Sequence, residues 1–180
     1  EMTLNQCIAA YPEDQKDLTS DTVRLFTQTR EYVINHPEVW KTPQDDVVNP
    51  AWRWNKTTEE TAYAFSALGY YFGKELSKTI TDVPIGLIMA AAGGAQISEL
   101  MPEETAKQQG YTISAAVGIA GYYNTLIHPF LHTPIRAMLF YQGESESNPQ
   151  NCGQYGKDLE EFVKALRTKW GSSFKFYNVQ

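Results

Sequence analysis

The chain has 180 residues, of which 42% are hydrophobic and 20% charged, a composition typical of a globular protein with enough length for one domain and its own core. The formal net charge of −6 predicts repulsion from nucleic acid and from anionic membrane surfaces, and no run of lysine or arginine offers a local exception. No apolar run is long enough to cross a bilayer. From the charge and the short apolar runs together, we expect neither nucleic acid nor a membrane as a partner.

The first third of the chain predicts one strand between irregular segments. Residues 1–21 are polar and are expected to form a loop or a short helix. Residues 21–27 alternate in polarity and are rich in β-branched and aromatic side chains, which predicts a strand. Residues 35–57 are rich in proline and tryptophan, and we interpret them as a long loop.

The tryptophans of this loop have two interpretations. Trp52 and Trp54 lie two positions apart, so an extended backbone would place both rings on one face, as stacking on a sugar requires. Trp40, earlier in the loop, is a further candidate for contact with a sugar. The alternative is that these rings pin the loop to the body of the protein.

A helix is predicted directly after this loop. Thr57 and Glu60 match a capping box, in which each side chain satisfies a backbone N–H group at the start of a helix. Gly69 and Gly73 lower helix propensity, so we expect them to allow close approach of a neighbouring strand or helix. The apolar stripe of this helix consists of Ala62, Phe65, Leu68, Phe72 and Leu76.

Residues 84–90 predict a buried strand that ends at Gly93 and Gly94. Paired glycines after a strand let backbone N–H groups approach a ligand or an oxyanion without interference from a Cβ atom. An ordinary tight turn explains two glycines equally well. The lysine and hydroxyl residue of a phosphate-binding loop do not follow them.

The remaining elements alternate between helices and strands. Residues 97–109 predict a short helix or irregular structure, and residues 121–127 predict a helix that Pro129 stops. Residues 154–170 predict a long helix ended by Gly171, followed by a strand over 174–179. This alternation predicts an α/β fold, a three-layer α/β/α sandwich with a mostly parallel sheet, as a single domain over residues 1–180.

The segment from Ile135 to Ser145 is the strongest candidate for a functional site. Its apolar part predicts a central strand, and Gln142, Glu144 and Ser145 follow where that strand ends. In open α/β sheets ligands bind at the carboxyl ends of the strands. We therefore expect these polar side chains to face a site.

Three ways of building a reactive centre within the chain are each incomplete. Ser145 with His128 or His132 lacks the closing glycine of a nucleophile elbow, because residue 147 is Ser. Cys152 has no neighbour that would stabilise a thiolate, and it forms either a disulfide with Cys7 or a free thiol. A metal site at His128 and His132 is disfavoured by the intervening Pro129. We therefore expect no metal and no cofactor.

Taken together, four segments of this sequence resemble the sialate O-acetylesterase family of SGNH-type hydrolases. They are residues 65–76, residues 83–88 leading to Gly93 and Gly94, residues 123–130, and Tyr141-Gln142-Gly143-Glu144-Ser145, which is the most specific. The resemblance implies a flavodoxin-like sandwich and a serine esterase that removes acetyl groups from carbohydrates without a cofactor. It also suggests a secreted, periplasmic or lysosomal protein.

The resemblance further implies which groups act. Gly93, Gly94 and Gln142 would supply oxyanion donors, and Glu144 would hold the Gln142 segment. The family's nucleophilic serine precedes residues like Glu1–Leu4, and its Asp-x-x-His segment follows a strand like residues 174–180. We therefore expect a catalytic domain that is incomplete at both ends, inactive alone, and completed by flanking sequence or another chain.

Two other functions stay open from the sequence. An acetylxylan esterase would use the same chemistry on a differently shaped sugar. A non-catalytic carbohydrate-binding or structural fragment would rely on Trp40, Trp52 and Trp54.

Overall fold

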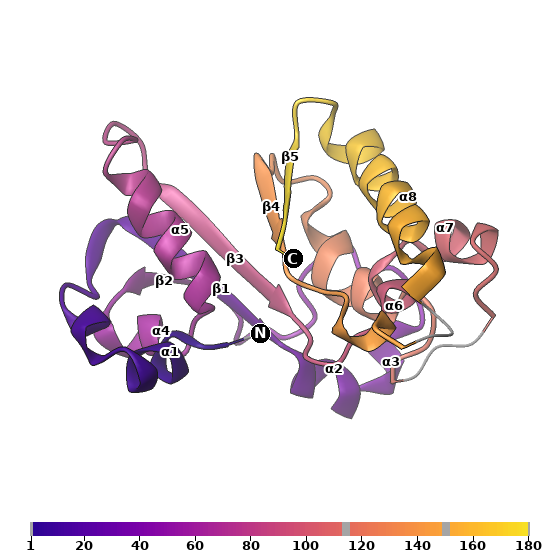
Figure 1. The fold of residues 1–180 in the computed structure, drawn as a ribbon, viewed down its shortest axis with the longest axis horizontal. Helices are drawn as coiled ribbons and strands as arrows, with labels where there is room; N and C mark the ends of the chain where they lie inside the picture. Colours follow the sequence, from indigo (N-terminus) through magenta and orange to yellow (C-terminus); the bar gives the residue numbers. More distant parts are fainter. Residues whose placement is uncertain (1, 113–115, 149–151, 180) are drawn as a thin grey trace. The chain divides into compact units, whose positions relative to one another are not determined.

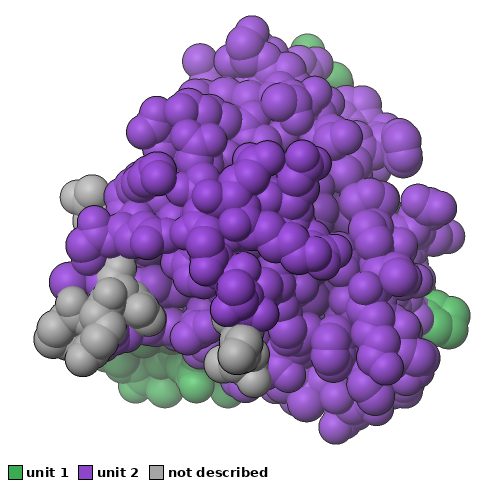
Figure 2. Space-filling model, turned by 90° about the vertical axis from the view of Figure 1, so that its right-hand side faces the viewer, with its two compact units in different colours: residues 1–28, 50–91 green, residues 29–49, 92–180 purple. Residues whose placement is uncertain are grey.

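The computed structural model describes residues 2–112, 116–148 and 152–179, which form a mixed α/β fold of helices and small sheets (Figure 1). The chain divides into two compact units, residues 1–28 with 50–91 and residues 29–49 with 92–180, coloured separately in Figure 2. The expectation of a single domain over residues 1–180 stays a prediction.

The first unit is built on a three-stranded sheet with the order β2-β1-β3. Its strands are β1 (Ser20–Thr29), β2 (Trp54–Thr57) and β3 (Ile85–Ala91), so strands are confirmed where they were predicted, over 21–27 and 84–90. The expectation that the second of these is buried was wrong, because the residues of β3 are half-buried or exposed. Strand β2 was missed within the predicted loop. It pairs antiparallel with β1, placing Trp54 opposite Phe26, where the two rings meet edge to face at 5.4 Å.

The predicted capping box was wrong by one residue. Thr58 caps helix α4 (Glu59–Tyr63) with Thr61 as its partner. Thr57 is instead buried at the end of β2, where its hydroxyl donates to the carbonyl oxygen of Val23 at 2.9 Å. The single predicted helix is also interrupted, because the Ser66 hydroxyl accepts the Gly69 N–H and starts a second helix, α5 (Ala67–Ser77).

Helix α5 packs against β3 through Gly73. A Cβ atom at Gly73 would lie 2.5 Å from Leu87 Cδ1, which confirms the predicted close approach to a strand. The most buried residues of α5 are Ala67, Tyr70 and Gly73, whereas the predicted stripe residues Leu68, Phe72 and Leu76 are half-buried. The break before Ala67 accounts for this change, since it separates α5 from the register of α4.

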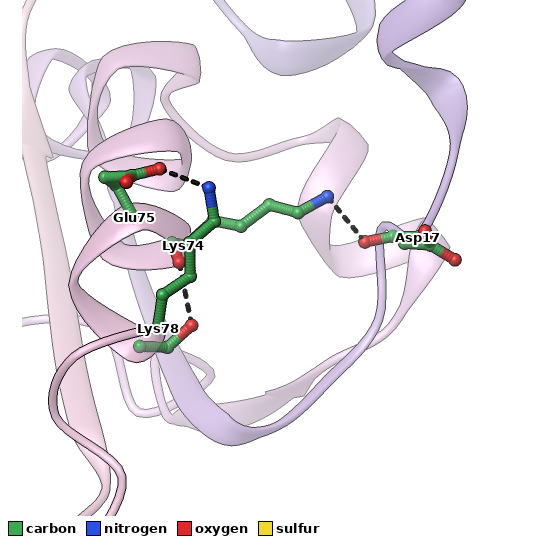
Figure 3. Close-up of polar contacts among 5 residues, drawn as sticks. Asp17, Lys74, Glu75 and Lys78 are labelled. Atoms are coloured by element: carbon green, nitrogen blue, oxygen red, sulfur yellow. Dashed lines mark hydrogen bonds and ion pairs between the residues drawn. The ribbon is translucent and has the colours of Figure 1, made fainter.

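Polar contacts hold α5 to the N-terminal segment of the same unit. The Lys74 ammonium donates to the carbonyl oxygen of Asp17 at 2.9 Å, while Lys78 pairs with Glu75 on the exposed side (Figure 3). The exposed pair contributes little to stability. Helix α1 (Leu4–Ala10) and the 3₁₀ turn η1 (Pro12–Gln15) complete this unit, and Leu4 and Ile8 of α1 enter its core.

The second unit contains a parallel pair of strands, β4 (Ala137–Phe140) and β5 (Lys175–Asn178). Helix α8 (Cys152–Trp170) covers them and ends before Gly171, whose φ of +86° suits a glycine at that position. Phe140, Phe162 and Phe176 join strands and helix, with ring centroids 5.3 to 6.2 Å apart. The strand predicted within the segment from Ile135 to Ser145, the strand predicted over 174–179 and the long helix are therefore confirmed. Among the described residues β4 pairs only with β5, so its predicted central place in a sheet stays a prediction.

Short helices make up the rest of the second unit. The helical backbone continues past the predicted stop at Pro129, because proline is tolerated in the first turn of a helix. These elements are α2 (Arg30–Asn35), α3 (Pro37–Trp40), α6 (Ile97–Leu100), α7 (Glu103–Gln108), the π-helix η2 (Tyr123–Ile127), and the 3₁₀ turns η3 (His128–Phe130) and η4 (Glu144–Glu146).

Strands β1 and β2 pair antiparallel, whereas β4 and β5 pair parallel. A mostly parallel sheet in three layers therefore stays a prediction. In the part of the chain that the structure describes, no helix is both long enough and apolar enough to cross a membrane.

Candidate functional site

Residues 92–95, which we call the glycine turn, follow β3 and contain both predicted glycines. The Ala95 N–H donates to the Ala92 carbonyl oxygen at 3.1 Å, and Gly94 has a φ of +78°, as glycine does at the third position of a type II turn. A Cβ atom at Gly93 would meet no atom within 4 Å. Among the described residues, no hydrogen bond engages the N–H of Gly93 or Gly94. Both glycines are exposed, so their unengaged N–H groups are available to a ligand.

Gln142 holds the end of the glycine turn. Its Nε2 atom donates to the Ala95 carbonyl oxygen at 3.1 Å and to the Glu146 carboxylate at 2.5 Å. Reversing the amide would place its oxygen against two acceptors, so these contacts fix its orientation. Its Oε1 atom is buried and accepts no hydrogen bond in the described part of the chain. Because both N–H hydrogens are used here, the role of Gln142 as an oxyanion donor stays a prediction.

Glu146 is the acidic residue that braces Gln142. It is 3% exposed, and its second oxygen accepts the Ile97 N–H at 2.6 Å, at the start of α6. Burial raises the pKa of Glu146 above the usual range of a glutamate, while the bonds from Ile97 and Gln142 oppose that rise. Sequence reasoning assigned this brace to Glu144, whose side chain is exposed.

Glu99 fixes the other side of the same segment. It is fully buried, and its carboxylate accepts the N–H groups of Gln96 at 2.8 Å, Ala116 at 2.8 Å and Val117 at 3.2 Å. Glu146 and Glu99 together hold the chain from the glycine turn into α6. Sequence reasoning missed both residues, because their partners lie up to 49 positions away.

Arg30 places a cation against the glycine turn. Its Nη1 atom donates to the Gly93 carbonyl oxygen at 2.5 Å, and its Nε atom donates to the Tyr122 hydroxyl at 3.1 Å. Burial raises the pKa of Tyr122 more than Arg30 lowers it, so the hydroxyl stays neutral and accepts this bond. Arg30 was also missed, since nothing near it in the sequence marks a site.

Gly143 shapes the loop that carries Gln142. Its φ is +134°, and a Cβ atom there would lie 3.2 Å from the Tyr155 hydroxyl oxygen. Tyr155 of α8 donates that hydroxyl to the Gln142 carbonyl oxygen at 2.8 Å. Burial and the nearby charges of Glu146 and Glu144 raise the pKa of Tyr155 to about 12, so it is a donor at neutral pH.

Within the described residues, the side chains of the other reactive residues form no hydrogen bond with the glycine turn, Gln142 or Glu146. Ser145 lies in η4, beside Glu146, and the Nδ1 atom of the half-buried His128 lies 2.9 Å from the Gln44 carbonyl oxygen, a contact that orients the ring. His132 is exposed, and both Cys7 and Cys152 are free thiols. Across residues 2–112, 116–148 and 152–179, no group of three or more His, Cys, Asp and Glu side chains is arranged to hold a metal ion.

The tryptophans differ in their surroundings. Trp40 lies against Gly118 and Gly121, and its carbonyl oxygen accepts the Asn124 side chain at 3.0 Å, which favours a role in pinning its segment. Trp54 is 48% exposed, and Trp52 is half-buried. Because Trp40 belongs to one unit and Trp52 and Trp54 to the other, a shared sugar platform stays a prediction.

Comparison with known proteins gives matches along nearly the whole chain. The family model described as carbohydrate esterase, sialic acid-specific acetylesterase, matches residues 14–178. A sialate O-acetylesterase from Pongo abelii is 26% identical over 189 aligned positions, covering 97% of this chain and 34% of that protein. The sialate O-acetylesterase of Homo sapiens is 28% identical over 145 positions, covering 72% of this chain and 26% of that protein.

The fold also matches a solved structure. A carbohydrate acetylesterase from Xanthomonas citri superposes with a TM-score of 0.73 at 24% identity, covering 92% of this chain and 36% of that one. At this identity the likeness concerns the fold. The chain spans about a third of the first curated relative and of this structure, and about a quarter of the second relative. The resemblance drawn from the sequence motifs is thereby confirmed.

Proposed function

Since this chain belongs to the carbohydrate esterase family of sialic acid-specific acetylesterases, we propose that it forms the oxyanion-binding part of an enzyme that hydrolyses acetyl esters of sugars. The observation that carries the proposal is the glycine turn, whose two glycines are exposed and whose N–H groups are unengaged among the described residues. Gln142 and Glu146 hold that turn in place.

The proposed reaction has the two steps of a serine esterase. A serine activated by histidine attacks the acetyl carbonyl, and the ester C–O bond breaks as the sugar leaves as its free hydroxyl, protonated by the histidine. Water then hydrolyses the acyl-enzyme, which releases acetate and regenerates the serine. We place the serine, the histidine and its aspartate outside this chain, in flanking sequence or another chain. The scheme uses only protein groups and water.

The contribution of this chain is electrostatic. Negative charge develops on the carbonyl oxygen as the serine attacks, and each fixed donor aimed at that oxygen contributes roughly 3–4 kcal/mol. The N–H groups of Gly93 and Gly94 are the proposed donors. Gln142 keeps Ala95, and with it the turn, in position, or it acts as a third donor by giving up one of its two side-chain N–H bonds.

We also propose that the complete domain is a three-layer, flavodoxin-like sandwich. The parallel pairing of β4 and β5 supports this, as does the likeness in fold to the carbohydrate acetylesterase from Xanthomonas citri. In such a sheet the segments that follow β3 and β4 would both contribute to the crevice at the strand ends.

A second candidate function is carbohydrate binding without catalysis, which the exposed ring of Trp54 favours. Acetate release distinguishes the two. The full-length protein that carries this chain is incubated with O-acetylated sialic acid and with acetylated xylan, and free acetate is measured. We expect acetate from at least one substrate. Binding of either sugar, seen as a change in tryptophan fluorescence, with no acetate released would favour the second candidate.

A further inference from the structure

The guanidinium of Arg30 is a cation beside the proposed oxyanion turn. Arg30 is half-buried at the start of α2, and its Nη1 atom lies 4.0 Å from the position that a Cβ atom at Gly94 would occupy. It reaches the turn through the bond to the Gly93 carbonyl oxygen. Any sugar whose acetyl group reaches the N–H groups of the turn would therefore come close to this positive charge.

The structural contacts of Arg30 use only part of its donor capacity. A guanidinium has five N–H donors in a fixed fork. One at Nη1 serves Gly93 and the one at Nε serves Tyr122, which leaves the two of Nη2 and the second of Nη1. Within the described residues Arg30 forms no ion pair, so its charge is balanced by no carboxylate there.

We propose that Arg30 is a specificity-determining residue that binds a carboxylate of the acetylated sugar, so that acidic O-acetylated sugars are preferred to neutral ones. The inference rests on the proposed function, because it places the acetyl group at the glycine turn. The fork of donors left on Arg30 matches the two oxygens of a carboxylate.

The net charge of the chain makes a local cation favourable for an acidic substrate. At a net charge of −6, the chain repels an anionic sugar over long range. A half-buried arginine at the turn, without an ion pair to any described residue, offsets that repulsion where the sugar binds. A neutral sugar such as acetylated xylan gains nothing from the same cation.

The competing explanation is that Arg30 only braces the turn by binding the Gly93 carbonyl oxygen. A brace would affect all acetylated substrates equally, whereas a carboxylate-binding residue affects only those that carry the charge. Two substrates that differ in that charge alone therefore separate the explanations.

The test uses O-acetylated sialic acid and its carboxyl methyl ester, with acetate release as the readout in the full-length protein. We expect wild type to prefer the free acid by about 10-fold or more in kcat/KM, the value of a hydrogen bond to a charged group. Arg30→Gln should abolish the preference, and Arg30→Lys should keep part of it, because lysine has the charge without the fork.

Arg136→Gln is the matched control. Arg136 is exposed and precedes β4, at the opposite end of that strand from Gln142, so the variant changes the net charge equally and should keep the preference. An Arg30→Gln protein that loses rate equally on both substrates, with its preference intact, would overturn the proposal. So would a wild type without any preference.

A binding measurement keeps this test separate from the proposed function. If folded wild type releases no acetate from either substrate, the proposed function fails. Calorimetric titration with sialic acid and its methyl ester then decides the role of Arg30. Tighter binding of the free acid in wild type, lost in Arg30→Gln, supports that role, and equal binding of the two sugars refutes it.

Discussion

Glu146 and Gln142 form the contact on which the position of the glycine turn depends. Gln142 and the glycines could be predicted from the sequence, because they stand directly after apolar strands. Glu146, Glu99 and Arg30 could not be, since each acts through a partner distant in sequence. The separation is 49 positions for Glu146 with Ile97 and 63 for Arg30 with Gly93. Such contacts exist only in the folded chain.

Removing Gln142 should affect catalysis more than stability. We expect Gln142→Ala in the full-length protein to lower kcat by roughly 100-fold or more, because an oxyanion donor is lost or displaced. Gln154→Ala is the control, since Gln154 also donates two side-chain bonds, to Gln109 and Asp158, away from the turn. Unchanged turnover in Gln142→Ala would remove Gln142 from the oxyanion site.

The two acidic residues of the Gln142 segment should differ in their effect on stability. Glu146→Ala leaves the Ile97 N–H and a Gln142 hydrogen unpaired in a buried site, which should lower the free energy of unfolding by about 2–4 kcal/mol. Glu144→Ala, at an exposed position, should change it by less than about 0.5 kcal/mol. Urea denaturation of both variants measures these free energies of unfolding. Equal losses in the two variants would mean that Glu144 stabilises the Gln142 segment as much as Glu146 does.

At the scale of elements, sequence periodicity predicted the long helix α8 and the strands. Capping hydrogen bonds determine where the helix predicted after Thr57 is divided. The helix expected after Thr57 is interrupted because Ser66 accepts the Gly69 N–H and starts α5. Strand β2 was missed because its residues alternate only weakly between polar and apolar side chains. Its extended backbone is stabilised by pairing with β1, a partner distant in the sequence. Local sequence therefore located the elements better than it located their ends.

Two glycine-to-alanine changes in helices should have opposite signs. Gly73→Ala in α5 places a Cβ atom 2.5 Å from Leu87 Cδ1, so we expect a loss of about 1–3 kcal/mol in the free energy of unfolding. Gly156→Ala in α8 meets no atom within 4 Å and should gain about 0.5–1 kcal/mol from helix propensity. Thermal unfolding should show a lower melting temperature for Gly73→Ala and a higher one for Gly156→Ala than for wild type. Stabilisation by Gly73→Ala would refute the close packing of α5 on β3.

At the scale of the whole molecule, the proposal places the oxyanion donors in this 180-residue chain and the nucleophile and base outside it, which predicts that the chain is inactive alone. We expect the purified chain to release no product from an aryl acetate, because the proposed nucleophile and base lie outside it. Ser145→Ala is the matched control for a nucleophile within the chain. Hydrolysis by the purified chain that Ser145→Ala abolishes would contradict this account and assign the nucleophile to Ser145.

The most direct test of the proposed oxyanion turn removes one backbone N–H. Gly93 occupies the second position of its turn and has no positive φ, so proline fits its backbone while deleting the donor. Gly93→Ala keeps the N–H and meets no neighbouring atom. In the full-length protein we predict that Gly93→Pro lowers kcat for acetate release by roughly 100-fold or more. Gly93→Ala should remain near wild type, and wild-type turnover in a folded Gly93→Pro protein would contradict the account.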